Sequence, residues 1–330
     1  MNNINMPETY EFDDVLIKPK LSLLSSRDDV DISFRFSNSF ILKFPLIASP
    51  MVGVTDGNFI KQLSDLGGLG IFHRFYKTES IRYNDIIHNV HPLADNYGIA
   101  LKIEDSFTDV AISLSPKIIL IDTANGYTKN LADYCSHVKT KINRSKNKNI
   151  LLMAGNVATK EGCDKLYHAG VDIIRVGIGG GSPCSTRNQT GIGIPNISAI
   201  MDCAVGKEGK YFIAIDGGIK NSGDFVKSIV AGADIGISGK LYAECYEAPN
   251  EGVLYGMASR THMENMKKRI KSVEGFDTYI EKKHSLAQFV KEFGYGIKSA
   301  GTYLNAKTLN EIRQNGVFVK VTNSAIKKNI

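Results

Sequence analysis

Eight short apolar runs, each followed by a helix-like stretch, constrain the fold of this chain more than any other feature. The runs are rich in β-branched and apolar residues and have the length of buried strands. The segments Asp56–Leu66, Thr159–His168 and Ser222–Ala231 have the amphipathic pattern of helices that connect parallel strands. The eight runs are Pro45–Ser49, Leu69–His73, Tyr97–Leu101, Lys117–Asp122, Asn149–Gly155, Asp172–Gly177, Tyr211–Asp216 and Ala233–Ser238.

Eight strand–helix units predict a (β/α)8 TIM barrel, formed by one catalytic domain over residues 1–330 without an inserted regulatory domain. Several runs are apolar throughout, as expected of barrel strands covered by helices. An open doubly wound sheet is the main alternative, but its first strand needs a glycine-rich nucleotide loop, and Pro45–Met51 has none. We expect an N-terminal cap or hairpin at 1–44, an active-site flap at 241–275 and a C-terminal extension at 276–330.

Composition and charge exclude several classes of protein. The 330 residues carry a formal net charge of +6, but the basic residues are scattered and form no stripe for nucleic acid. The sequence begins without a signal-peptide pattern and has no run of apolar residues long enough for a membrane span, so we expect a cytoplasmic protein. Five widely spaced cysteines fit neither a disulfide framework nor a zinc site.

The most unusual loop, Gly177–Arg187, follows the sixth run and is rich in glycine. Glycines let backbone amides approach a phosphate closely, and Ser182 adds a hydroxyl donor. A lone cysteine is more often a buried, inert thiol. In this loop, beside Arg187, we expect Cys184 to have a lowered pKa and to act as a nucleophile.

Two further glycine-bearing loops follow the seventh and eighth runs, at Asp216–Ile219 and Ser238–Lys240. In a barrel of this type, phosphate groups bind at the loops after these two strands, where backbone amides point at the ligand. The two loops therefore predict a phosphate cradle, to which Lys240 adds a positive charge. The alternative is that the glycines serve only the geometry of tight turns.

Motifs spread over the whole chain match those of a single enzyme family. The sequence resembles the IMP dehydrogenase and GMP reductase family, which implies a purine nucleoside monophosphate substrate (GMP or IMP) and a covalent bond from Cys184 to C2 of the purine. The matching segments are Phe12–Leu16, Ser49–Met51, Gly67–Ile71, His73–Arg74, Asp122–Tyr127, Ala154–Thr159, the Cys184 loop, Asp216–Ile219, Gly256–Met257 and Val273–Gly275.

By this resemblance, Thr186 and Glu274 form a proton-handling pair beside Cys184, since ammonia leaves only when protonated. Taken alone, Glu274 would be a solvated loop carboxylate and Thr186 a capping hydroxyl. The carboxylate of Asp216 suits the two ribose hydroxyls, although a helix N-cap is the alternative. The resemblance implies substrate contacts from Ser49, Met51, Asn156, Arg175, Gly181, Ser182, Asp216, Gly218, Gly239, Lys240, Met257, Ser259 and Gly275.

The resemblance further implies NADPH as cofactor. It also implies a homotetramer, because Ser299 and Tyr303 match a segment that reaches the cofactor of a neighbouring subunit. Arg74 and Arg187 suit the additional phosphate of NADPH, with surface ion pairs as the alternative. A potassium ion on Gly179, Gly181 and Cys184 is implied in the same way. The cofactor set is Arg74, Asp122, Asn125, Gly126, Arg187, Ser299 and Tyr303.

The interval Leu241–Lys271 distinguishes the two family activities. Family dehydrogenases activate water with an Arg-Tyr pair in this flap, and this interval contains no such dipeptide. We therefore predict a GMP reductase, which converts GMP to IMP and ammonia with NADPH. An IMP dehydrogenase that makes XMP with NAD, and a catalytically silent purine-nucleotide-binding protein, are the alternatives. Departures from the family pattern occur at Val52–Gly53 for Asp-Thr, Gly180 for Pro and Ala258 for Ser or Gly.

Overall fold

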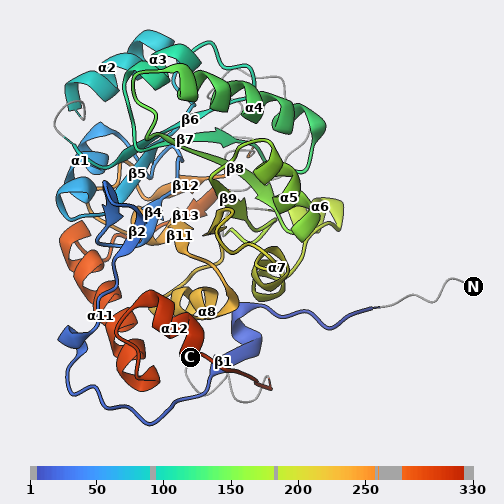
Figure 1. The fold of residues 1–330 in the computed structure, drawn as a ribbon. Coiled ribbons are helices and arrows are strands. Elements are labelled where there is room, and N and C mark those ends of the chain that lie inside the picture. The colour runs from blue at the N-terminus through green and yellow to red at the C-terminus, as the bar shows by residue number, and fades with distance from the viewer. Residues whose placement is uncertain (1–5, 90–93, 182–184, 257–258, 260–276, 323–330) are drawn as a thin grey trace, which may run out of the picture.

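A closed barrel of eight parallel strands forms the centre of the molecule (Figure 1). In this computed structural model we describe residues 6–89, 94–181, 185–256, 259 and 277–322. Neighbouring strands follow the order β10-β11-β4-β5-β6-β7-β8-β9, so the predicted TIM-barrel fold is confirmed. The strands are β4 (Leu46–Ala48), β5 (Leu69–Phe72), β6 (Tyr97–Leu101), β7 (Ile118–Asp122), β8 (Leu151–Val157), β9 (Ile173–Val176), β10 (Phe212–Asp216) and β11 (Ile235–Ser238).

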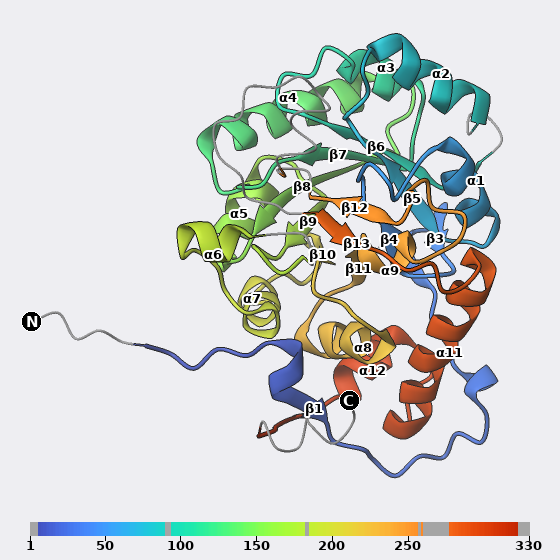
Figure 2. The ribbon, with the colours of Figure 1, turned by 180° about the vertical axis from the view of Figure 1, so that it is seen from behind.

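Helices surround this barrel, as Figure 2 shows from the opposite side. Polar side chains fix several helix starts: Asp56 accepts from the backbone N–H of Phe59, and Thr159 from that of Gly162. The three predicted connecting helices are confirmed as α1, α5 and α8. The helices are α1 (Gly57–Asp65), α2 (Glu79–Asn89), α3 (Thr108–Ser113), α4 (Lys129–Arg144), α5 (Lys160–His168), α6 (Thr186–Thr190), α7 (Asn196–Cys203), α8 (Ser222–Ala231), α9 (Lys240–Ala243), α11 (Leu286–Leu304) and α12 (Leu309–Asn315).

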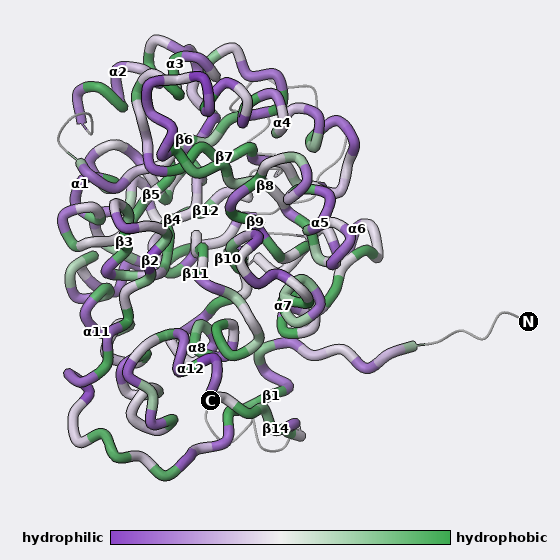
Figure 3. The backbone as a smooth tube through the Cα atoms, viewed as in Figure 1, coloured by the Kyte–Doolittle hydropathy of each residue, from purple (hydrophilic) through white to green (hydrophobic). Residues whose placement is uncertain are grey.

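The core has two layers because each barrel strand buries both of its faces. Inward-facing side chains such as Ile71, Leu120 and Ile237 fill the barrel, and outward-facing ones pack beneath the helices. The hydrophobic colour of β6 and β7 against the mixed colours of the outer helices shows this pattern (Figure 3). No helix in the described part of the chain is long and apolar enough to cross a membrane.

An N-terminal hairpin closes the bottom of the barrel, where the strands begin. Its strands β2 (Phe34–Ser37) and β3 (Phe40–Leu42) contribute Phe40 and Leu42 to the apolar cluster inside the barrel. Phe34 and Phe36 make edge-on ring contacts with Phe212, the first residue of β10. The hairpin thus seals the end opposite to the strand C-termini.

Two short antiparallel ribbons lie outside the barrel. β1 (Val15–Ile17) pairs with β14 (Phe318–Lys320), which joins the two ends of the chain. β12 (Val253–Tyr255) pairs with β13 (Asp277–Tyr279) and thereby connects the two sides of the predicted flap segment. Within the predicted N-terminal cap or hairpin at 1–44, residues 34–42 form the hairpin, and β1 pairs with the C-terminal segment.

Candidate active site

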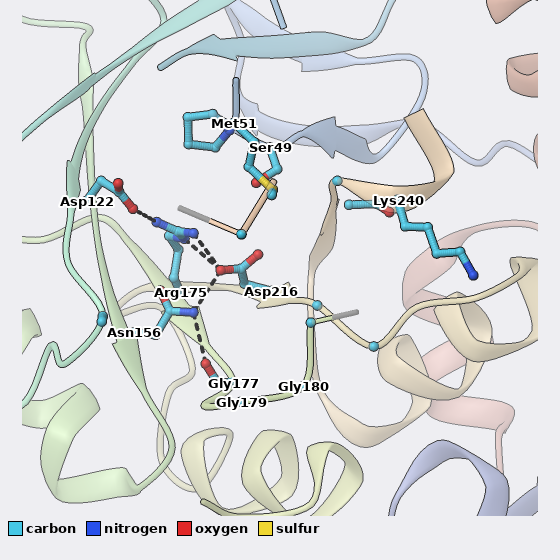
Figure 4. Close-up of a pocket in the computed structure, with 18 of the residues that line it drawn as sticks. Ser49, Met51, Asp122, Asn156, Arg175, Gly177, Gly179, Gly180, Asp216 and Lys240 are labelled. Atoms are coloured by element: carbon cyan, nitrogen blue, oxygen red, sulfur yellow. Dashed lines mark hydrogen bonds and ion pairs between the residues drawn. The ribbon is translucent and has the colours of Figure 1, made fainter. Parts of the chain in front are cut away.

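A cavity of about 510 Å³ opens at the C-terminal ends of the barrel strands (Figure 4). Residues from the loops after β4, β5, β7, β8, β9, β10 and β11 line it. Because the C-termini of parallel strands meet at one end of a barrel, residues that are distant in sequence converge here. The cavity therefore lies where the fold places catalytic chemistry.

A chain of ion pairs crosses the cavity floor (Figure 4). Arg175 of β9 donates from Nη1 to Oδ1 of Asp122 at 2.8 Å, and from Nη2 to Oδ2 of Asp216 at 2.5 Å. Arg74 donates from Nε to the other oxygen of Asp122 at 3.0 Å. Asn156 donates from Nδ2 to Oδ2 of Asp216 at 2.7 Å. Strands β7, β9 and β10 are thereby joined through side chains at the cavity floor.

Charge within this chain of ion pairs is balanced, with two guanidinium groups and two carboxylates. Burial alone would raise the pKa of Asp122, but Arg175 and Arg74 outweigh it and lower that pKa below its ordinary value. Burial would likewise lower the pKa of Arg175, which Asp216 and Asp122 raise instead. The two guanidinium groups and the two carboxylates have opposite formal charges, so together they add no net formal charge to the cavity floor.

Asp216 presents one free carboxylate oxygen. Its Oδ2 accepts from Asn156 and Arg175, while Oδ1 accepts no hydrogen bond from the residues described here. The N-cap of the following helix, α8, is Asn221, so the alternative in which Asp216 caps a helix is wrong. A carboxylate held on one side and open on the other suits vicinal hydroxyl donors.

Glycines bring the loops after β9, β10 and β11 together at the other end of the cavity. Gly217 and Gly218 have φ angles of +79° and +85°, a conformation that favours glycine. A Cβ on Gly217 would lie 2.8 Å from the backbone nitrogen of Gly181, and one on Gly239 would lie 2.7 Å from the Met51 sulfur. Only glycine permits this close approach, which leaves backbone donors facing the cavity.

Two lysines lie at the edge of the glycine loops and line the same cavity. The Nζ of Lys220 is 2.6 Å from Oδ2 of Asp13, and the Nζ of Lys240 is 4.0 Å from Oε1 of Glu244. The Lys240 side chain is 47% exposed and points away from Asp216 (Figure 4). Its contact with Glu244 is long, so little holds the ammonium group in place.

Comparison with known proteins identifies the family of this chain. A family model described as "IMP dehydrogenase / GMP reductase domain" matches residues 9–329. The chain belongs to this family. It is 32% identical to a GMP reductase of Onchocerca volvulus, over 98% of this chain and 93% of the relative. It is 32% identical to a GMP reductase of Buchnera aphidicola, over 94% of each, and 30% identical to human GMP reductase 2, over 98% and 97%.

Membership of the family directs attention to the residues predicted from the sequence, most of which meet in the cavity. Five of them lie outside the described residues: Cys184, Glu274, Ser182, Met257 and Gly275. Those that line the cavity are Ser49, Met51, Arg74, Asp122, Asn156, Arg175, Gly179, Gly181, Thr186, Asp216, Gly218, Gly239 and Lys240. Those that do not are Asn125, Gly126, Arg187, Ser259, Ser299 and Tyr303.

Arg187, predicted to contact the cofactor, also binds three groups of its own chain. Its Nε donates to the Ile178 carbonyl at 2.9 Å, Nη2 to the Ile194 carbonyl at 2.8 Å, and Nη1 to Glu11 at 2.6 Å. Each guanidinium nitrogen donates one hydrogen bond within the chain, and contact of Arg187 with the cofactor stays a prediction. In this family member Arg187 ties helix α6 to the N-terminal segment.

Gly126 and Ser259 have structural environments that the sequence did not predict. The Gly126 backbone donates to the Asn156 carbonyl at 2.8 Å, and a Cβ there would lie 2.8 Å from the carbonyl carbon of Gly155. Gly126 is therefore required by close packing on β8. Ser259 is 1% exposed, and its backbone N–H donates to the Gly256 carbonyl.

Sequence reasoning missed several cavity residues and one neighbour. Phe75, Thr123, Lys220 and Leu254 line the cavity without having been predicted to do so. Asn196, the first residue of α7, lies against the glycine loops. Leu254 and Asn196 carry no recognisable pattern, because their place depends on contacts between distant segments. Phe75 and Lys220 directly follow motifs that had been recognised, and that adjacency could have identified them.

Proposed function

We propose that the chain is a GMP reductase that converts GMP to IMP and ammonia at this cavity. The observation that carries the proposal is the balanced ion-pair chain, which places an open carboxylate, Asp216, beside the glycine loops. This arrangement suits a nucleotide with its ribose on Asp216 and its phosphate on Gly218 and Gly239. Two features favour the reductase over the dehydrogenase: the relatives' names and the absence of an Arg-Tyr pair in Leu241–Lys271.

In the proposed reaction, the thiolate of Cys184 attacks C2 of the purine, and the C2 amino group leaves as ammonia. Thr186 and Glu274 carry the proton that makes ammonia a leaving group. A hydride then adds to C2 and the thiolate leaves, which gives IMP and regenerates the enzyme. Arg175 and Asp216 form an ion pair on the floor of the cavity, and in this reaction they orient the nucleotide without taking part in proton transfer.

The family's reaction implies a nicotinamide cofactor, which supplies the hydride when bound. Arg74, Phe75, Asp122 and Thr123 line the side of the cavity away from the glycine loops and fit such a group. Arg74 binds Asp122 through its Nε atom. Its two Nη atoms make no hydrogen bond with the residues described here. They can donate to a phosphate, and we propose that this is the additional phosphate of NADPH.

The remaining parts of the proposal concern an ion and the assembly. The backbone carbonyls of Gly179, Gly181 and Cys184 would hold a potassium ion. Ser299 and Tyr303 would reach the cofactor of a neighbouring copy in a homotetramer. The segment 241–275 would act as a flap, with the cap at 1–44 and the extension at 276–330 outside the catalytic core.

One assay tests the proposed function. Purified protein is incubated with GMP and NADPH, and loss of NADPH absorbance and release of ammonia are followed. We expect both signals from the wild type and neither from Cys184→Ala. Conversion of IMP and NAD in place of GMP and NADPH would identify the alternative dehydrogenase, and nucleotide binding without turnover in either direction would identify a silent binding protein.

A further inference from the structure

A buried amide lies against the glycine loops and has an unused acceptor. Asn196, the first residue of α7, is 1% exposed. Its Nδ2 is 3.4 Å from the Gly217 carbonyl oxygen, which is long for a hydrogen bond. Its Oδ1 is buried and has no hydrogen-bond partner among the described residues. Buried amide oxygens are nearly always paired, because leaving one unpaired costs free energy.

The Asn196 amide contacts both loops that form the glycine-rich end of the cavity. A Cβ built on Gly180, in the loop after β9, would lie 2.8 Å from Nδ2 and 3.0 Å from Oδ1. A Cβ on Gly218, in the loop after β10, would collide with Nδ2. Both glycines are therefore in contact with one amide group, which lies behind the surface that faces the cavity.

We propose that Asn196 is a positioning residue that holds these two loops in register for the 5′-phosphate of the nucleotide. When the phosphate binds, the loop backbone shifts slightly, and Oδ1 of Asn196 accepts the backbone N–H of Gly180. At the same time, the contact from Nδ2 to the Gly217 carbonyl shortens to a normal hydrogen bond. The unpaired acceptor thus favours the phosphate-bound arrangement of the loops over the unbound one.

Gly180 fits this role for two reasons. It has a backbone N–H, which can donate to the buried amide oxygen of Asn196. It also leaves room for the Asn196 amide, because any side chain would come within 3.0 Å of it. Gly180 itself lines the cavity. Gly180 and Asn196 are therefore placed to form a hydrogen bond when the phosphate binds.

This inference rests on the proposed function for the identity of the nucleotide, and binding measurements separate the two. We would measure the affinities of GMP and guanosine by calorimetry for the wild type and Asn196→Ala. Loss of one cradle hydrogen bond should weaken GMP about tenfold, and guanosine, which has no phosphate, should bind within about twofold of wild type. Asn315→Ala, a half-buried asparagine on α12 far from the cavity, is the matched control and should change neither affinity.

A second variant tests the contact itself. In the wild type, Gly180→Ala should weaken GMP binding because its methyl group meets the Asn196 amide. In the Asn196→Ala background, the same Gly180→Ala change should cost much less, since the space has been vacated. This non-additivity is the signature of direct contact. Gly180→Ala in the wild-type background does not depend on the stability of Asn196→Ala.

Three results would overturn the inference: equal weakening of GMP and guanosine, a lower melting temperature with unchanged GMP affinity, or additive effects of the two substitutions. Failure of the proposed function looks different. If the wild type binds GMP but releases no ammonia, the reductase assignment is wrong, while the phosphate-specific effect of Asn196→Ala still decides the present inference.

Discussion

At the scale of single residues, Arg175 determines the geometry of the cavity floor. It is 6% exposed and binds carboxylates on two other strands, Asp122 of β7 and Asp216 of β10. A planar guanidinium can bond to two carboxylates at fixed angles, whereas an ammonium acts as a single point charge. The orientation of both aspartates therefore depends on this one side chain.

Replacing Arg175 with lysine should separate the effect of its positive charge from the effect of its planar guanidinium shape. We expect Arg175→Lys to keep the cavity floor neutral but to lose one of the two carboxylate contacts. Leaving one aspartate poorly paired in a buried site should lower the free energy of unfolding by about 2–3 kcal/mol and weaken GMP binding about tenfold. Urea unfolding and calorimetry would measure the two effects, and an unchanged GMP affinity would contradict this account.

The pKa of Asp122 gives the stability of the protein a predictable dependence on pH. Arg175 and Arg74 lower this pKa in the folded state, so the folded protein binds fewer protons at this group than the unfolded chain does. The contribution is therefore complete above the unfolded value of about 3.9 and is lost as the pH falls through the folded value.

Removing the charge with Asp122→Asn should lower the free energy of unfolding at about pH 7 by about 3 kcal/mol, because two guanidinium groups lose a partner. The difference from wild type should shrink as the pH falls below the unfolded value of about 3.9 and through the lower folded value, where the wild-type carboxylate is protonated as well. Chemical unfolding at several pH values measures this. A difference that stays constant down to the lowest pH would show that Asp122 acts through shape alone.

Four of the five cysteine thiols are buried, so the reaction of the fifth with a thiol reagent can be measured separately. Cys135, Cys163, Cys203 and Cys245 are each 0% exposed, and burial raises the pKa of Cys135 and of Cys245 to about 12. Protonated, inaccessible thiols do not react at neutral pH. We expect a thiol reagent to label one cysteine in the native protein and five in denaturant. In Cys184→Ala the native signal should vanish, and two or more labelled native thiols would contradict this.

At the scale of elements, the contact between two loops explains the departure at Val52–Gly53. Gly53 has a φ angle of +86°, and its carbonyl accepts from Nδ2 of Asn250 at 2.8 Å. The same Nδ2 donates to the Ala243 carbonyl at 3.1 Å, at the end of α9. The hydrogen bonds of Asn250 thus connect the loop that carries Met51 to the segment that leads into β12, which contains Leu254. Met51 and Leu254 both line the cavity.

Gly53→Ala should reveal how much this connection matters. An alanine at a positive φ is strained, and its Cβ would lie 3.2 Å from the Asn250 Cβ, so we expect a loss of about 1–2 kcal/mol in unfolding free energy. The KM for GMP should rise more than kcat falls, because in the proposed site this loop contacts the substrate and not the leaving group. Asn250→Ala should reproduce the KM effect without the strain, and a purely kcat effect in both variants would argue against this role.

Elements of the barrel could be predicted from the sequence because each carries its own signal. All eight strands overlap their predicted runs, and β8 alone extends beyond its run, to Val157. Pairing of β1 with β14 could not be predicted, since it joins residues about three hundred positions apart in sequence. In the same way, the ion pair between Arg187 and Glu11 could not be predicted, since the two residues lie 176 positions apart in sequence.

At the scale of the whole molecule, one surface of the barrel exposes several large apolar side chains. Leu21 and Leu23 are 88% and 84% exposed, and Tyr303 on α11 is 67% exposed. The backbone N–H of Lys20 donates to the Tyr303 carbonyl, so these residues belong to one surface. Large exposed apolar side chains that cluster are typical of contacts between protein molecules.

The proposed tetramer predicts a result that a cofactor site formed within one chain could not give. Tyr303 does not line the cavity of its own chain, so if it contacts a cofactor, that cofactor lies in a neighbouring copy. Cys184→Ala should be inactive because each chain lacks its nucleophile. Tyr303→Ala should be impaired because each cavity lacks its neighbour's ring. When the two variants are mixed and allowed to exchange subunits, some cavities gain an intact cysteine from one chain and an intact tyrosine from the next.

Activity of the mixture should therefore exceed the mean of the two separate variants. A double variant carrying both substitutions, mixed with wild type, controls for simple dilution of active chains. If Tyr303 acted within its own chain, subunit exchange would assemble no site better than those of Tyr303→Ala alone, and the mixture would show only the mean. Activity at that mean, with exchange of subunits verified by native mass spectrometry, would rule out a cofactor site completed by a second copy.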